Sequence, residues 1–321
     1  MIRVTLKDVA KLAGVNFTLV SKYLNDSSQA RMKPETRERI KRAIESLKYR
    51  PSASARALRS GRSRIIGMVS GDLRNAYWAH FASCAMRYLR GQDYQLLLAV
   101  RDSDASPEPL EFLVDRGVDG IIISGADLPP GYVAPCPMVV HDTASCGGDV
   151  VNPDMVPALE EALAGVRGRI TALLPPNSAW RAIFADAAER NGLTSELCTV
   201  PLAPEKRPEV LRRICRSAPD WMLVSGWHTL TQLLELLHGE FTGFHPKIIA
   251  HANCRGEFLN APEIACAIVS STTTLVREVC SLLLDRIAAP GVSAVRKLPC
   301  RCIVSGCAEF RTLYAPHFEL T

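Results

Sequence analysis

Short apolar runs alternate with amphipathic segments from residue 65 to residue 270, and this alternation restricts the fold more than any other feature. The apolar runs, which are rich in Ile, Val and Leu, lie at 65–71, 94–100, 118–125, 169–175, 220–226, 247–253 and 264–270. Apolar residues recur at helical spacing in the segments between them, at 78–92, 110–117, 182–192, 209–218 and 230–239. Such alternation is typical of βαβ units with a parallel sheet. It predicts two doubly wound halves, with ligands gathered in the crevice at the carboxyl ends of the strands.

Basic charge is concentrated in the first 64 residues. The chain of 321 residues has a net charge of +5, but residues 1–64 contain 16 Lys and Arg against 5 Asp and Glu. This head therefore carries +11, and the remaining 257 residues carry −6. A content of 47% hydrophobic and 22% charged residues is globular, which excludes a disordered or fibrous chain. We expect a small basic domain followed by an acidic body long enough for two domains.

The first 24 residues predict two short helices joined by a glycine turn. Thr5 and Asp8 have the spacing of a capping box, and apolar residues at 9, 10, 12 and 13 follow at helical spacing. Gly14 allows a tight turn, and Asn16 can cap a second helix. Two short helices with this connection form a helix-turn-helix.

The second predicted helix has one face that suits the major groove of DNA. A rotation of about 100° per residue directs positions 19, 20, 23 and 24 inward and leaves Phe17, Thr18, Ser21 and Lys22 outside. Lys22 can donate to guanine or to phosphate, the two hydroxyl groups can bond bases or backbone, and Phe17 can contact a thymine methyl group. The alternative is a solvated helix face with Phe17 at the edge of the core.

A third helix is predicted from Pro34, with apolar residues at 40, 43, 44 and 47 and basic residues toward solvent. Lys33 stands at its cap, where it opposes the helix dipole and where a DNA phosphate would suit it. Pro51 ends this helix, and Ser52 can cap a fourth segment that stops at Gly61. That Ala-rich segment is too short to be a stable helix by itself.

Residues 4–67 contain the stretches TLKDVAKLAGVNFTLVSKYLN and PETRERIKRAIESLKYRPSASARALRSGRSRIIG, and they closely resemble the head of the LacI/GalR family of bacterial transcription regulators. The resemblance implies a homodimer on a pseudo-palindromic operator in double-stranded DNA, with repression as the default. It also implies that residues 52–60 form a hinge helix that folds on DNA, and that Leu58 enters the minor groove.

These features give a set of candidate DNA contacts. The major-groove candidates are Phe17, Thr18, Ser21 and Lys22, and the minor-groove candidates are Ala55 and Leu58. The candidate backbone contacts are Thr5, Asn16, Asn25, Lys33, Arg56 and Arg59. An exposed leucine between two arginines suits an apolar wedge that unstacks one base step. The alternative is that Leu58 anchors this segment on the body.

The body resembles a periplasmic sugar-binding protein, as the family's effector domain does, most clearly at 72–100, 116–125 and 219–237. Arg181 falls on the family's effector-binding arginine. Gly226-Trp227 and Ala252-Asn253, however, replace the polar pairs that the family uses to bind an effector. Alanine accepts no hydrogen bond and tryptophan offers a stacking face, so we expect a planar or anionic effector and not a typical free sugar.

The candidate effector cleft consists of Asn75, Trp78, Ser124, Trp180, Arg181, Trp227 and Asn253. The alternative is that the tryptophans fill a narrowed crevice in which no effector binds.

The predicted fold class is α + α/β. It consists of a three-helix helix-turn-helix head, a hinge helix, and two doubly wound parallel-sheet subdomains of the periplasmic-binding-protein type. The predicted domains are the head at 1–50, the hinge at 51–63 and an effector-binding and dimerisation core at 64–321. Within the core, subdomain one covers about 64–155 plus 275–300, and subdomain two about 156–274 plus 301–321.

Neither a metal site, a cofactor nor a catalytic site is predicted. The 11 cysteines all follow residue 80, include no CxxC pair and cluster only at Cys300, Cys302 and Cys307, where buried thiols are the expected state. The sequence lacks the motifs HExxH, GxGxxG, GxxxxGK[ST] and GxSxG. Residues His141, His228 and His251 lie near predicted strand ends, where we expect hydrogen-bonded loop histidines.

Charged residues at 7, 8 and 11 interrupt any signal-peptide apolar region, and no apolar run of about 18 residues occurs. We therefore expect a cytoplasmic protein, associated with the nucleoid through DNA, with no membrane partner.

Three hypotheses follow. The first is a DNA-binding regulator controlled by a small molecule in the core cleft. The second is an effector-independent regulator whose core only dimerises or docks a protein partner. The third, an enzyme with the head as a targeting device, has no motif in its support, and we expect no enzyme.

Overall fold

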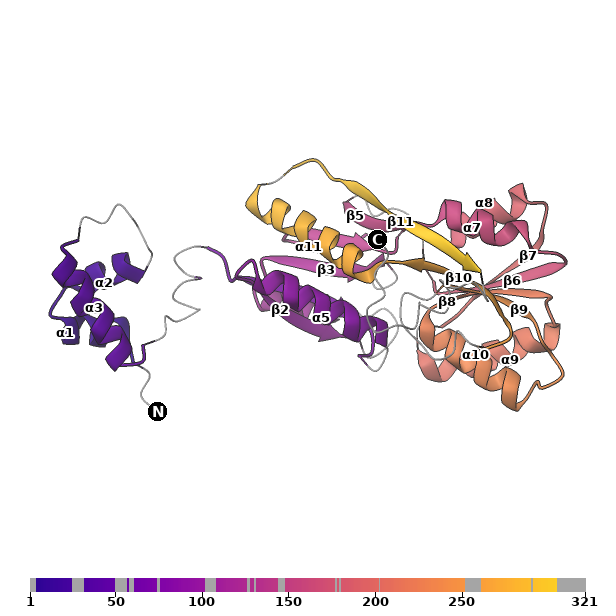
Figure 1. Ribbon diagram of the computed structural model, residues 1–321, viewed down its shortest axis with the longest axis horizontal. Coiled ribbons are helices and arrows are strands. Elements are labelled where there is room, and N and C mark those ends of the chain that lie inside the picture. Colours follow the sequence, from indigo (N-terminus) through magenta and orange to yellow (C-terminus); the bar gives the residue numbers. More distant parts are fainter. Residues whose placement is uncertain are drawn as a thin grey trace. The chain divides into compact units, whose positions relative to one another are not determined.

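The computed structural model describes residues 4–24, 32–49, 57, 61–73, 76–101, 108–125, 128–129, 131–143, 148–176, 178, 180–201, 203–251, 261–289 and 291–304. The chain divides into two compact units, a head at Met1–Ser63 and a body at Arg64–Thr321 (Figure 1).

Three helices form the head: α1 (Leu6–Ala13), α2 (Phe17–Leu24) and α3 (Pro34–Ser46). All three begin where the sequence predicts. They share one small core of Val9, Ala10, Ala13, Val20, Ile40 and Ala43. The predicted capping box is present, since the Thr5 backbone N–H donates to Asp8 Oδ2 at 2.8 Å and Asp8 N–H donates to Thr5 Oγ1 at 3.4 Å. Leu12 does not join the apolar stripe, because 54% of it is exposed.

Gly14 ends α1 in the left-handed conformation, with φ 62° and ψ 41°. Its N–H bonds the carbonyl groups of Ala10 and Lys11, which closes the last turn of the helix. A residue with a Cβ adopts this conformation at a cost, so glycine fits the turn between α1 and α2.

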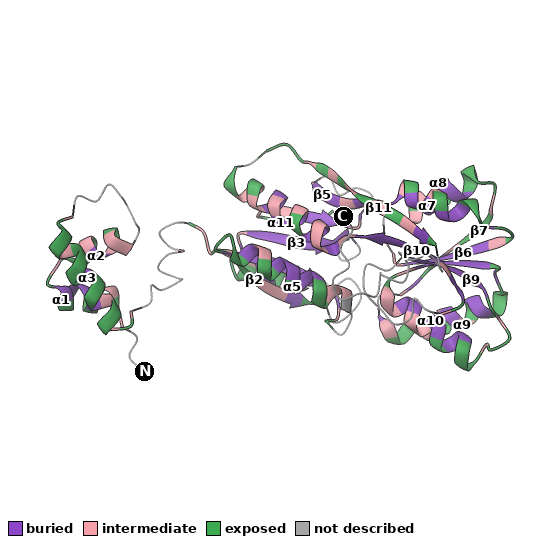
Figure 2. Ribbon diagram, in the orientation of Figure 1, coloured by how far each residue is buried: buried purple, intermediate pink, exposed green. Residues whose placement is uncertain are grey.

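The first half of the body is a parallel sheet in the order β2-β1-β3-β4-β5. Its strands are β1 (Ile65–Ser70), β2 (Gln95–Val100), β3 (Gly120–Ser124), β4 (Met138–His141) and β5 (Asp149–Asp154). Helices α5 (Ala76–Arg90) and α11 (Thr272–Ala288) cover one face, and α6 (Glu108–Asp115) covers the other. Both faces of the sheet are therefore buried (Figure 2).

The second half continues as β10-β9-β8-β6-β7, again with neighbouring strands parallel. Its strands are β6 (Arg169–Leu174), β7 (Thr194–Thr199), β8 (Trp221–Ser225), β9 (Lys247–His251) and β10 (Ile264–Ser270). Helices α7 (Val156–Ala164) and α8 (Trp180–Arg190) cover one face; α9 (Arg207–Ser217), preceded by the short η2 (Pro204–Lys206), and α10 (Trp227–Gly239) cover the other (Figure 1).

One strand, β11 (Val295–Val304), belongs to both halves. Residues 295–299 pair with β5 in parallel, and residues 300–304 pair with β10 in antiparallel. All 11 strands of the described body thus form one continuous sheet.

The predicted fold class is confirmed, and the seven apolar runs correspond to β1, β2, β3, β6, β8, β9 and β10. The apolar runs and helical spacings of the sequence do not predict strands β4, β5, β7 and β11 or helices α7 and α11. These strands are short, contain proline or carry many polar residues, and the long α11 follows the last predicted run. Within the described part of the chain, no helix is both long enough and apolar enough to cross a membrane.

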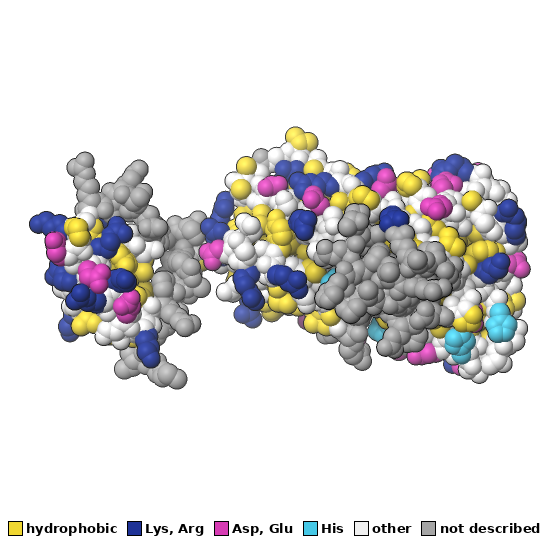
Figure 3. All heavy atoms as spheres, in the orientation of Figure 1, with side chains coloured by type: hydrophobic (Ala, Val, Ile, Leu, Met, Phe, Trp, Pro, Cys, Tyr) yellow, Lys and Arg dark blue, Asp and Glu magenta, His cyan; other side chains and the backbone are white. Residues whose placement is uncertain are grey.

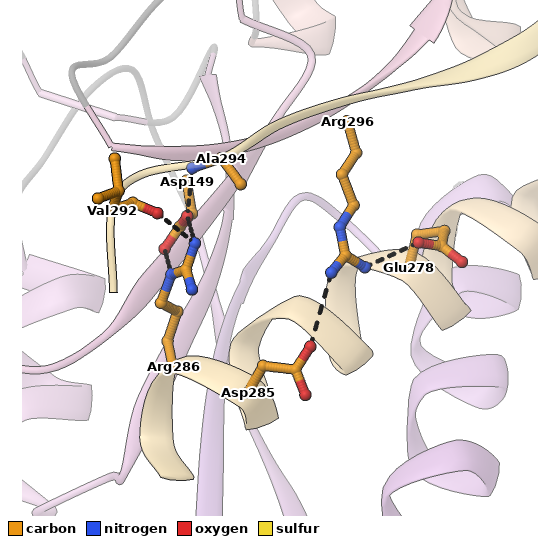
Figure 4. A network of polar contacts seen from close by, with 7 residues as sticks. All are labelled: Asp149, Glu278, Asp285, Arg286, Val292, Ala294 and Arg296. Atoms are coloured by element: carbon orange, nitrogen blue, oxygen red, sulfur yellow. Dashed lines mark hydrogen bonds and ion pairs between the residues drawn. The ribbon is translucent and has the colours of Figure 1, made fainter. Parts of the chain in front are cut away.

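An ion-pair network holds α11 against the sheet (Figure 4). Arg286 on α11 makes a two-pronged contact with Asp149 on β5, with Nε–Oδ2 and Nη2–Oδ1 distances of 2.8 and 3.0 Å. Asp149 Oδ1 also accepts from the Ala294 N–H at 2.8 Å, and Arg286 Nη2 donates to the Val292 carbonyl at 2.5 Å. This carboxylate therefore joins β5, α11 and the segment that enters β11.

The Asp149–Arg286 pair is mostly buried, so the loss of one partner should destabilise the protein. The Asp149 and Arg286 side chains are 10% and 19% exposed. We predict that Asp149→Asn lowers the free energy of unfolding by about 3 kcal/mol, because Arg286 keeps its charge without a counterion. Glu240→Gln is the control, since it breaks an exposed pair with Arg212 and should lower the free energy of unfolding much less. Urea denaturation measures both, and equal losses would contradict the prediction.

His141, the last residue of β4, is buried without charge. Its ring stacks on Phe81 of α5, with centroids 5.0 Å apart and planes at 23°, and lies 5.9 Å from the Trp78 ring. Removal from water disfavours the imidazolium form, and burial lowers the pKa of His141 to about 4. The folded protein therefore holds a neutral His141 at neutral pH.

This burial predicts acid sensitivity. The unfolded chain protonates His141 below its ordinary pKa of 6.5, whereas the folded chain does not until about pH 4, so stability is lost as the pH falls through this interval. We predict that His141→Gln removes about 2 to 3 kcal/mol of the difference in unfolding free energy between pH 7 and pH 4.5.

The control is Gln92→Ala, because this exposed residue does not titrate and its replacement should leave the pH dependence unchanged. Urea denaturation at the two pH values gives the comparison. A wild-type pH dependence in His141→Gln would refute this assignment.

Candidate functional site

The outer face of α2 presents the residue types that the sequence predicts for it. Phe17 is 53% exposed, Thr18 and Lys22 are exposed, and Ser21 is half-buried. On the opposite side of the helix, Val20 is fully buried in the head core. The helix is thus fixed by its inner face, and its outer face is available to a partner.

The neighbouring residues fix the start of α2 and add positive charge. Asn16 caps the helix, because its Oδ1 accepts from the Thr18 N–H at 2.8 Å. Lys33 is exposed at the start of α3 and makes no side-chain cap. The guanidinium of Arg37 lies 5.8 Å from the centre of the Tyr23 ring. Basic side chains are spread over the surface of these helices (Figure 3).

Several predicted DNA contacts lie outside the described residues: Asn25, Ala55, Arg56, Leu58 and Arg59. Within the predicted hinge, Ala57 is helical, and its carbonyl accepts from the Gly61 N–H at 2.8 Å.

The body contains a cavity of about 180 Å³ at the carboxyl ends of its strands. This volume is well above the ~10–15 Å³ that one water molecule needs, so it can hold a small metabolite. The first half contributes residues that follow or end β2 to β5 and residues that begin α5 and α11. The second half contributes residues at the ends of β6 to β9 and at the starts of α8, α9 and α10.

Aromatic rings form much of the cavity wall. Trp78 lies in the first turn of α5, Trp180 begins α8 and Trp227 begins α10, and all three line the cavity. Trp180 packs against His251 with ring centroids 4.4 Å apart. Gly71 allows Trp78 its position, because a Cβ there would lie 2.5 Å from the indole nitrogen.

Two hydrogen bonds order the polar groups of the cleft. Ser178 Oγ, in the second half, donates to Asp142 Oδ1, in the first half, at 3.1 Å. Ser225 Oγ and His251 Nδ1 lie 3.1 Å apart at the ends of β8 and β9. The first of these bonds connects the two halves across the opening between them.

The structure brings together four of the predicted effector residues and leaves one aside. Trp78, Ser124, Trp180 and Trp227 line the cavity. Arg181 follows Trp180 on α8 and is not among the lining residues, although its Nη1 is buried with no hydrogen-bond partner in the described part of the chain. Asn75 and Asn253 lie outside the described residues.

Two arginines of the cavity wall were not predicted. Arg101 directly follows β2, and Arg207 begins α9. The position of Arg101 after an apolar run could have indicated it, because residues after parallel strands line the crevice. No comparable signal marks Arg207. All three histidines named near strand ends, at 141, 228 and 251, also line the cavity.

The cysteines that the structure describes are free thiols. Cys300 Sγ donates to the Val269 carbonyl at 3.2 Å, and burial raises the pKa of this thiol to about 12. Among the described residues, no group of three or more His, Cys, Asp or Glu is placed to hold a metal ion. Cys307 lies outside the described part.

Comparison with known proteins identifies the head. The family model "Bacterial regulatory proteins, lacI family" matches residues 5–52. The HTH-type transcriptional regulator PtxS of Pseudomonas plecoglossicida is 36% identical over 169 residues, which cover 50% of this chain and 49% of that protein. The catabolite repressor/activator of Escherichia coli strain K12 is 37% identical over 130 residues, covering 40% of this chain and 39% of that protein. The matched region spans about half the length of these curated relatives, or less.

The fold is that of a solved repressor. The lac repressor dimer bound to operator and the anti-inducer ONPF aligns with a TM-score of 0.73 at 17% identity, over 94% of this chain and 98% of that one. At this identity the likeness shows the fold alone. The head thus matches the lacI family of bacterial regulatory proteins over residues 5–52, and nearly the whole chain has the fold of the lac repressor.

Proposed function

We propose that this protein is a sequence-specific DNA-binding transcriptional regulator and not an enzyme. It acts as a repressor on a pseudo-palindromic operator, as a homodimer in the cytoplasm at the nucleoid. The observation that carries the proposal is the outer face of α2, where hydroxyl, cationic and aromatic side chains stand exposed on a helix whose other face is buried. Support comes from PtxS, a transcriptional regulator, and from the lac repressor dimer, which was solved on operator DNA.

The proposed DNA contacts fall into two groups: one reads the base sequence, and the other positions the head on the DNA backbone. Phe17, Thr18, Ser21 and Lys22 read base edges in the major groove. The groups that hold the head on the DNA backbone are Thr5, Asn16, Asn25, Lys33, Arg56 and Arg59, which set register without reading sequence. The charge of +11 in residues 1–64 supplies the attraction to phosphate that both sets need.

The proposed hinge at 51–63 joins the head, at 1–50, to the core at 64–321. Ala55 and Leu58 enter the minor groove, where the leucine unstacks one base step. In the core, subdomain one is 64–155 plus 275–300, and subdomain two is 156–274 plus 301–321. The shared strand β11 supports a division near residue 300, because its pairing partner changes from β5 to β10 there.

Control by a small molecule is the proposed role of the cleft. Residues of both halves line the cleft. A ligand that binds more tightly to one conformation of the two halves therefore shifts the population toward that conformation. This conformational change of the core reaches the two hinges of the dimer and withdraws Leu58 from the minor groove. Arg181 remains a proposed effector residue, since its Nη1 is buried without a partner among the described residues.

Footprinting of the protein on its genome tests the proposal as a whole. We expect protected sites that share one palindrome, with the genes beside them indicating the class of effector. Thermal-shift screening with metabolites then separates a ligand-controlled regulator from one whose core only dimerises or docks a protein. Protection without a common sequence would overturn the proposed specificity.

Replacement of Lys22 tests base reading. We predict that Lys22→Ala relaxes sequence preference at one half-site position and costs about 1 to 3 kcal/mol of discrimination there, because the donor to the base edge is removed. Lys41→Ala on α3 is the control, with the same change of charge in the head but no place on the α2 face. Anisotropy titrations against a set of half-site variants measure both. Unchanged preference in Lys22→Ala, or an equal effect of Lys41→Ala, would exclude base reading by Lys22.

Replacement of Leu58 tests the minor-groove wedge. We predict that Leu58→Ala weakens binding to every palindromic operator and reduces the bend of the bound DNA, because the apolar insertion that opens the base step is lost. Anisotropy gives the affinity and a gel-shift bend assay gives the angle. Unchanged affinity and an unchanged DNA bend in this variant would refute the insertion of Leu58 into the minor groove.

A further inference from the structure

Two arginines from opposite halves of the body line the cavity. Arg101 follows β2 of the first half, and Arg207 begins α9 of the second half. Arg207 is held in place, because its Nε donates to the carbonyl oxygen of Pro201, another lining residue, at 2.8 Å. Among the described lining residues the carboxylate is Asp142, which accepts from Ser178. The side-chain charge of the described wall is therefore positive.

The backbone adds to this positive potential. The cavity is lined by first-turn residues of α5, α8, α9 and α10 and by Leu275 near the start of α11. Helix N-termini carry partial positive charge, which an acidic residue in the first turn usually offsets. No acidic residue occupies the first turn of α5, α8, α10 or α11. Gly226, at the N-cap of α10, has no side chain to cap its helix.

Two buried nitrogen atoms of the wall have no hydrogen-bond partner in the described part of the chain. One is Trp180 Nε1, on a side chain that is 1% exposed, and the other is His141 Nε2, on a side chain that is 2% exposed. An indole N–H can only donate, so it needs an acceptor that the described residues do not supply. Leaving such a group unpaired is unfavourable, and a ligand oxygen would supply the missing acceptor.

We infer that this cavity binds a small organic anion whose oxyanion group bridges Arg101 and Arg207, with its body against the tryptophan rings. The inference rests on the proposed control by a small molecule and specifies the chemistry of the ligand. Arginine pairs with carboxylate and phosphate oxygens through parallel N–H donors, so either group fits the bridge. Because the two arginines come from different halves, the anion links the halves directly.

A neutral sugar fits this wall less well than an anion does. Each sugar hydroxyl donates a proton as well as accepting one, and in the described wall Asp142 is the one carboxyl group. The remaining wall is rich in donors and in ring faces. An acceptor-rich ligand with few hydroxyl groups therefore satisfies more of the wall than a polyhydroxylated neutral one.

Tryptophan fluorescence of the full chain provides the test, since three of its four tryptophans line the cavity. The probes are benzoate, gluconate, glucose 6-phosphate and neutral glucose. We expect a saturable change with at least one of the three anions and none with glucose. The responding probe distinguishes a flat carboxylate, a hydroxylated carboxylate and a phosphate ester.

Variants then locate the anion. Arg101→Gln and Arg207→Gln should each weaken the binding of that probe by about tenfold or more, since a hydrogen bond to a charged group contributes about 1.5 to 3 kcal/mol. Arg216→Gln, on the same helix as Arg207 but exposed and away from the wall, is the matched control and should bind as wild type does. Circular dichroism checks that every variant is folded.

Anion binding and operator binding are tested by different measurements. No response to any of the three anions, glucose binding at equal strength, or wild-type affinity in both arginine variants would overturn the anion site. Operator binding is measured separately, and both arginine variants should keep wild-type affinity for DNA without ligand. An absence of specific operator binding by the wild-type protein would instead refute the proposed function as a DNA-binding regulator.

Discussion

The architecture of the body depends on the way in which β11 joins its two halves. This strand is parallel to β5 and antiparallel to β10, and the change occurs between Pro299 and Cys300. The strands of the first half therefore point toward the second half, and those of the second half point back toward the first. Their carboxyl ends face one another, at Asp154 of β5 and Ser270 of β10, and the cavity lies in this region. In a βαβ unit the helix begins after the strand, so the same pairing also brings helix N-termini to the cavity.

That geometry connects fold to chemistry. A parallel sheet with helices on both faces collects positive helix ends at one edge, and here two such edges meet. The helix N-termini give this edge a positive potential. The aromatic rings and arginines at the edge add ring faces and further positive charge to it. The Ser178–Asp142 bond and the Arg286–Asp149 pair show how polar contacts position these segments. The cleft is thus a consequence of strand direction first and of side-chain choice second.

Local sequence signals were sufficient for the head and for the central strands. Thr5, Gly14 and Asn16 each act within a few residues of themselves, so the capping box, the turn and the second cap were predicted and found. Uninterrupted apolar runs such as 121–123 are buried on both sides and were recognised as strands. Leu12 shows the limit, because its helical spacing fits the stripe, yet α2 and α3 leave it exposed.

The cleft was predicted in part. Trp78, Ser124, Trp180 and Trp227 were found because each stands at a strand end or helix start that the pattern had located. Arg207 was missed, since nothing in its neighbours shows that α9 begins at the cavity. Strands β7 and β11 were missed because polar residues alternate along them, and edge and crossing strands satisfy their backbone groups without a continuous apolar run.

The sequence by itself determined the class of fold, the three helices of the head, the central strands of the body and the separation of a basic head from an acidic body. These properties follow from composition, spacing and local hydrogen bonding, which a linear chain already contains. Only the tertiary structure decided that β11 would be shared, that Arg101 and Arg207 would line one cavity, and that Arg181 would stand beside it. Those outcomes depend on the packing of segments that lie far apart in the sequence, which no local pattern encodes.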